Sequence, residues 1–140
     1  ESRYHIAVER YVKTLDIEHS SLLELTSTYI IPTLEKQMQQ LGEAHEAITS
    51  SALKKLHKAR VSEFESVFAE VLATYESFKS KVEKSRKSHD ENKRMWEIME
   101  DLQPASFKLR DAVDTSELLV ANELWPLPKY REMLLAHNLA

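Results

Sequence analysis

The sequence predicts an all-α fold, an elongated antiparallel bundle of three long helices that becomes four segments if one of the first two helices breaks. The chain of 140 residues contains one glycine, whereas about 7% would be ordinary, and β-rich folds and phosphate-binding loops need glycines at their turns. Its apolar residues recur every three or four positions, which is the period of one helix face. No linker rich in proline, glycine or serine interrupts residues 1–140, so we expect a single domain.

The first helix is expected over residues 1–41. Pro32 lies inside the apolar pattern, but the spacing continues beyond it, so we predict a kink near Thr28 to Pro32 rather than an end. Gly42 is predicted to end the helix because glycine adopts positive φ at little cost. The expected inward stripe is Tyr4, Val8, Tyr11, Leu15, Leu22, Leu25, Tyr29, Leu34, Met38 and Leu41.

The second helix is expected over residues 43–87. From Phe64 to Val82 the apolar spacing alternates between four and three, which is typical of helices that pack at shallow angles. Ser62 could start a capping box, so it marks the weakest point of this helix. The expected inward stripe is Leu53, Leu56, Phe64, Phe68, Val71, Tyr75, Phe78 and Val82.

A turn near residues 86–89 is predicted from charge. Lysines and arginines gather at the end of the second helix, and acids follow at Asp90 and Glu91. Cations suit the negative end of a helix dipole and anions the positive end. Ser88 is expected to cap the next helix, with Glu91 completing the capping box.

The third helix is expected over residues 89–122, with a second kink at Pro104. Its predicted inward residues are Met95, Met99, Leu102, Leu109, Val113 and Val120. Residues 123–140 form the tail, where Pro126 and Pro128 impose an extended path, and a short turn is expected over 131–137. A tryptophan left in water there would expose a large apolar surface, so we predict that Trp125, Leu127 and Tyr130 form a structural anchor against the first and third helices.

Composition excludes several classes of function. The chain has 19 basic and 23 acidic side chains and a net charge of −4, so no overall basic field favours nucleic acid. No stretch approaches the roughly 20 apolar residues that cross a bilayer. Zero cysteines exclude disulfides, thiol catalysis and cysteine-based metal sites and are compatible with a cytoplasmic location. The chain begins at Glu1 without a signal peptide, so we expect a fragment of a larger protein.

Candidate chemistry rests on few residues. A di-iron bundle needs two Glu-x-x-His motifs, and the sequence offers a related spacing once, at Asp16 and His19. His57 stands among lysines but has no small-residue pocket for phosphotransfer, so a solvated basic face is the favoured interpretation. The other histidines lack metal-ligand spacing and are expected to be structural or exposed; they are His5, His45, His89 and His137. We therefore predict no catalytic, cofactor-binding or metal-binding residue.

The two ends of the chain carry a family resemblance. The run Glu123-Leu124-Trp125-Pro126-Leu127-Pro128-Lys129-Tyr130-Arg131-Glu132-Met133-Leu134-Leu135 resembles the terminal signature of type III glutamine synthetases. Leu109-Arg110-Asp111-Ala112-Val113-Asp114, Gln103-Pro104, Tyr11-Val12-Lys13-Thr14-Leu15-Asp16-Ile17-Glu18 and Ile30-Ile31-Pro32 resemble further segments of that family. The resemblance is strong at both ends and weak over residues 42–87.

The resemblance implies a helical C-terminal extension of a larger enzyme. Enzymes of this family condense glutamate with ammonia using ATP and Mg²⁺ or Mn²⁺. Their metal-binding carboxylates and arginines lie on β-strands of a catalytic domain, and this chain lacks that domain. The implied role is non-catalytic and structural or oligomer-supporting, and the implied partners are the upstream catalytic domain and neighbouring subunits of a homo-oligomer, not nucleic acid or a membrane.

Two other classes of function stay open. An autonomous helical adaptor could present the Phe64 to Val82 seam and the basic turn to a partner helix. A phosphotransfer or metal-dependent enzyme would depend on His57, or on Asp16 with His19.

Overall fold

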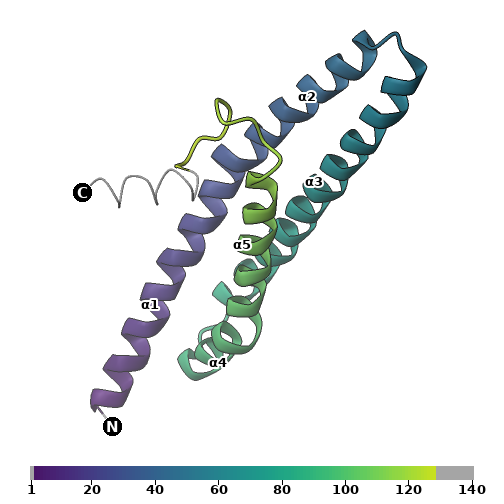
Figure 1. Ribbon diagram of the computed structural model, residues 1–140. Helices are drawn as coiled ribbons and strands as arrows, with labels where there is room; N and C mark the ends of the chain where they lie inside the picture. Colours follow the sequence, from purple (N-terminus) through teal and green to yellow (C-terminus); the bar gives the residue numbers. More distant parts are fainter. Residues whose placement is uncertain (1, 129–140) are drawn as a thin grey trace.

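A computed structural model describes residues 2–128, and these residues form helices and turns without a strand. The all-α prediction is therefore confirmed for this part of the chain. In Figure 1, α1 and α2 form one long rod, α3 runs back beside it, and α4 and α5 form a shorter third rod. The elements are α1 (Ser2–Leu25), η1 (Thr26–Ile30), α2 (Ile31–Ala47), α3 (Ser51–Arg86), α4 (Glu91–Glu97), η2 (Ile98–Leu102) and α5 (Gln103–Glu117).

At both places where a kink is predicted, the helix contains a π-helical turn of five residues that ends two residues before the proline. Pro32 and Pro104 are the second residues of α2 and α5. A proline has no N–H and its ring crowds the carbonyl four residues earlier. The wider turn avoids this conflict because the preceding residue bonds five residues back, as the Ile31 and Gln103 amides do to the carbonyls of Thr26 and Ile98. The rods therefore pass through both prolines without ending.

The prediction that Gly42 ends the first helix is wrong, because α2 continues to Ala47. No residue from 2 to 128 has positive φ, and the glycine is followed by helix formers that outweigh its cost of about 1 kcal/mol. The chain leaves the helix at Ile48, whose ψ is 126°. Ser50 then caps α3 by accepting the Leu53 amide at 3.3 Å.

The prediction of a Ser88 cap is also wrong, because α4 begins at Glu91 and its cap is Asp90. The Asp90 carboxylate accepts the amides of Asn92 and Lys93 at 3.0 and 3.3 Å. A carboxylate caps well and also complements the positive helix end. The second helix is unbroken through Ser62, and the third rod ends at Glu117 rather than residue 122.

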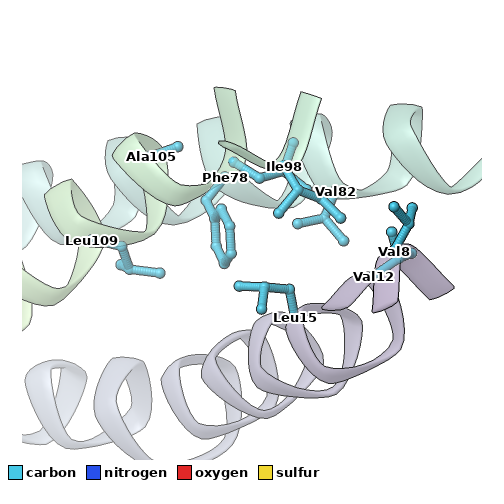
Figure 2. Packing of buried hydrophobic residues seen from close by; sticks show 9 residues of the cluster. Val8, Val12, Leu15, Phe78, Val82, Ile98, Ala105 and Leu109 are labelled. Atoms are coloured by element: carbon cyan, nitrogen blue, oxygen red, sulfur yellow. The ribbon is translucent and has the colours of Figure 1, made fainter. Parts of the chain in front are cut away.

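The core consists of two clusters, one at each half of the rods. The first lies among α1, α3 and the third rod, and Figure 2 shows Phe78 pointing from α3 toward Leu15 and Leu109. The second lies among η1, α2, α3, α5 and the tail. The first cluster contains Val8, Val12, Leu15, Phe78, Val82, Ile98, Leu102, Ala105 and Leu109, and the second contains Ile30, Leu34, Leu41, Phe64, Val71, Ala112, Val120 and Trp125.

Five residues predicted to face inward are exposed. Tyr29 and Met99 lie inside the π turns, where one extra residue per turn rotates the stripe away from a period of 3.6. Leu53 and Leu56 are exposed at the end of α3 that the shorter third rod does not reach (Figure 1). Tyr4 lies in the first turn of α1 and is exposed as well.

Among residues 2–128, no helix combines the length and hydrophobicity that a bilayer crossing requires.

Candidate functional site

A groove of about 550 Å³ lies between α1 and α5. Its walls are largely apolar, and charged side chains from both helices reach it. Such a combination of apolar walls with few polar groups is typical of binding sites. The residues that line it are Ile17, Glu18, Ser21, Leu22, Leu25, Thr26, Ile30, Arg110, Val113, Asp114 and Leu127.

Asp114 gives the groove an acidic character. Its partial burial, followed by repulsion from Glu117 and Asp111, raises the pKa of this carboxyl above its usual range, and Arg110 partly offsets the shift. Glu18 lies on the opposite wall. A ligand that brings a cation to this groove would therefore relieve unfavourable charge.

Ile17 is the most exposed apolar side chain of the groove, at 67% relative exposure. It lies on the solvent side of α1, whereas Ile30 at the other end of the groove is fully buried. The groove therefore has a buried end at Ile30 and a solvent-exposed end at Ile17. The exposed end carries apolar surface that a ligand could cover.

A polar cluster beside the first core cluster joins α1 to the other rods. The Arg94 guanidinium contacts the Asp16 carboxylate at 2.6 Å. Arg86, at the end of α3, donates to the Asp16 carbonyl at 3.0 Å and to the Ser20 hydroxyl. The carboxylate that the sequence suggested as a metal ligand is therefore engaged by arginine.

His19 is buried, with 1% relative exposure. Its Nε2 lies 3.2 Å from the Gln103 side-chain oxygen, and its ring meets Phe78 edge to face at 5.1 Å. Its Nδ1 has no hydrogen-bond partner among the described residues. Burial lowers the pKa of His19 below its usual value, against smaller opposing effects of Gln103 and Asp16. The spacing of Asp16 and His19 thus produces two separate structural contacts.

Two further histidines form a pair that the sequence did not suggest. The rings of His45 and His57 stack at 5.4 Å, and their Nδ1 atoms lie 3.1 Å apart. In this contact one Nδ1 donates and the other accepts. The pair bridges α2 and α3 across the turn at residues 48–50.

A third group could hold a metal ion. One ligand atom from each of His5, Glu9 and Glu91 lies within 4.8 Å of the others, and imidazole with carboxylates suits zinc. The same side chains already form ion pairs, His5 with Glu91 at 3.4 Å and Glu9 with Lys13 at 3.2 Å. This group was not predicted from the sequence, because Glu91 arrives from another helix and the spacing of four residues between His5 and Glu9 is the only local signal.

The predicted anchor residues lie near the groove. Trp125 is 9% exposed and belongs to the second core cluster, and Leu127 packs against that cluster and lines the groove. The chain before them is tied to α2, where Gln37 accepts the Ala121 amide at 2.9 Å. Tyr130 lies outside the described residues, as do the expected turn over 131–137 and most of the tail. The stabilising role of the three residues stays a prediction.

Comparison with known proteins supports the resemblance. The family model described as the glutamine synthetase C-terminal domain matches residues 1–49. A glutamine synthetase of Bacteroides fragilis is 25% identical over 94% of this chain and 19% of its own length. A type-3 glutamine synthetase of Dictyostelium discoideum is 23% identical over 96% of this chain and 19% of its own length. The resemblance to the C-terminal domain of type III glutamine synthetases is confirmed, and the chain spans about a fifth of these relatives.

Proposed function

We propose that this chain is a non-catalytic, structural C-terminal domain of a type III glutamine synthetase, and that its parent is an ATP-dependent glutamate–ammonia ligase. The observation that carries the proposal is the form of the similarity. Two glutamine synthetases match nearly the whole of this chain, while the matched part fills about a fifth of each. The family model that matches residues 1–49 is described as the glutamine synthetase C-terminal domain, which supports placing the chain at that end of the parent.

The architecture suits a structural role. The three rods are held by apolar packing and by the Asp16–Arg94 ion pair, and the side chains nearest to known chemistry, His19 and Asp16, are engaged in structural contacts. We propose that the domain contacts the upstream catalytic domain and neighbouring subunits of a homo-oligomer, in the cytoplasm, and that ATP and Mg²⁺ or Mn²⁺ bind elsewhere in the parent.

The test uses the full-length parent enzyme. Deleting the segment that corresponds to residues 2–128 should reduce the number of subunits per oligomer, obtained by dividing the light-scattering mass by the mass of the shortened subunit. The reason is that the domain would no longer join subunits. Trp125→Ala should weaken assembly in the same assay and Trp96→Ala should not, since Trp125 is buried and Trp96 is exposed. An intact oligomer after deletion would contradict the oligomer-supporting role.

The alternative is an autonomous adaptor that binds a partner helix, favoured by the groove between α1 and α5. Sequencing the DNA upstream of the Glu1 codon separates the two proposals. An open reading frame for a ligase domain supports the first, and an independent start codon supports the adaptor.

A further inference from the structure

We propose that the groove between α1 and α5 binds the C-terminal segment of the same chain, residues 129–140, which lie outside the described part of the structure. This inference concerns the chain by itself and does not depend on the proposed function.

The apolar walls of the groove match the sequence of the segment. Ile17 is 67% exposed on the outer wall, and a volume of about 550 Å³ is of the size that accommodates a cluster of apolar groups. Tyr130, Met133 and Leu134 are spaced by three and one, so they fall on one face of a single helical turn. Helix-in-groove binding uses side chains in this pattern.

The position and length of the segment also fit. Leu127 already lines the groove, and the segment begins two residues later. The stretch of the first rod from Ile17 to Ile30 extends about 20 Å at a rise of 1.5 Å per residue, and the segment of 12 residues covers about 18 Å of it even at that rise, the shorter of the two regular backbone conformations. A tether this short gives the segment an effective concentration of about 1 mM at the groove, so weak contacts suffice to hold it.

The charges are complementary. Glu18 and Asp114 line the groove, and Asp111 and Glu117 stand close enough to raise the pKa of Asp114. Lys129 and Arg131 at the start of the segment supply cations. The remaining charges can pair as well, because Arg110 lines the groove and Glu132 follows in the segment.

Cysteine cross-linking of the complete 140-residue chain tests the inference, since the sequence has no natural cysteine. One variant combines Ile17→Cys with Leu134→Cys. The matched control combines Leu56→Cys with Leu134→Cys, because Leu56 is also exposed on a helix but lies beside the turn at 48–50, remote from the groove (Figure 1). Binding in the groove should make intrachain disulfide formation at least about tenfold faster in the first variant.

Equal rates in the two variants would overturn the inference, and disulfide-linked dimers as the main product of the first variant would assign the groove to a second copy instead. If circular dichroism shows that Ile17→Cys loses helix, Ser21→Cys, an exposed lining residue, replaces it. In the first variant, adding Lys129→Glu and Arg131→Glu should slow cross-linking at least about threefold at low salt, and the effect should shrink at high salt because salt screens the charges. An unchanged rate after the double charge reversal would refute the charge complementarity on which the inference rests. Failure of these tests would leave the glutamine synthetase proposal standing.

Discussion

Replacing Trp125 with alanine tests whether the tail stabilises the fold. The side chain is 9% exposed and packs in the second core cluster with Leu34 and Phe64. A tryptophan buries about 150 to 250 Å², and at about 25 cal/mol per Å² this corresponds to roughly 3 to 6 kcal/mol for the buried nine-tenths. A compact unfolded state lowers that value by about 10 to 40%. We therefore expect Trp125→Ala to reduce the free energy of unfolding by about 3 to 5 kcal/mol, the usual range for a large buried aromatic.

The assay is urea unfolding followed by circular dichroism, with Trp96→Ala as the matched control. The chain has two tryptophans, and Trp96 is 60% exposed, so its removal should change the free energy of unfolding by less than about 0.5 kcal/mol. With a slope of about 2 kcal/mol per M urea, the Trp125 variant should unfold at a midpoint lower by about 1.5 to 2.5 M. The two single variants thus separate burial from the general loss of an aromatic ring.

A midpoint for Trp125→Ala that matches the unchanged chain would refute this reasoning. It would mean that the packing of the tail on α2 and α3 contributes no net stability and that the tryptophan acts against another part of the parent protein. An equal loss in both tryptophan variants would also contradict it, because exposure would then not govern the effect.

Three further predictions concern polar groups. Burial lowers the pKa of His19 from 6.5, so as pH falls below 6.5 the unfolded chain binds a proton at this position before the folded chain does. The contribution of the neutral ring to the free energy of unfolding should be fully present above pH 6.5. Below that pH it should decline by at most about 1.4 kcal/mol per pH unit. His19→Gln should remove this part of the decline, measured by urea unfolding from pH 7.5 to 5, and identical pH profiles would contradict the assignment. Asp16→Asn should cost about 1 to 3 kcal/mol because it removes the negative charge that pairs with Arg94. Glu9→Gln, in an exposed pair with Lys13, should cost below about 1 kcal/mol, and equal thermal shifts would argue against a special role for Arg94. Calorimetry should detect no submicromolar binding of ATP, Zn²⁺ or Mn²⁺, and a stoichiometric zinc signal that His5→Ala abolishes would establish the His5–Glu9–Glu91 group as a metal site.

Local signals in the sequence were enough to predict the helices and the two places where their hydrogen bonding is irregular. Proline at positions 32 and 104 acts on its own turn, so the sequence locates both irregularities, although not their π-helical form. The exposure of Tyr29 and Met99 follows from that form, because a helical stripe drawn at a period of 3.6 cannot anticipate an inserted residue. Gly42 failed as an end signal because glycine permits an end without requiring one.

The candidate sites depend on contacts that a sequence period does not contain. Asp16 meets Arg94 and His5 meets Glu91 across more than 70 residues of chain, and the groove exists only because α5 packs beside α1. The burial of Trp125 could be predicted from the sequence, since a tryptophan followed by Pro126 and Pro128 combines a large apolar surface with a backbone that cannot continue the helix.

The length of the third rod explains why the tail matters. α5 ends at Glu117, while α2 and α3 continue side by side toward the turn at residues 48–50 (Figure 1). Val120 and Trp125, which follow α5 in the chain, belong to the same buried cluster as Leu34, Leu41 and Phe64. A longer α5 could also cover this cluster, but the helix ends at Glu117, and after Trp125 the chain passes through Pro126 to Leu127, which lines the groove. Two residues of the tail therefore contribute to different parts of the structure. Trp125 completes the second cluster with a buried indole, and Leu127 lines the groove between α1 and α5.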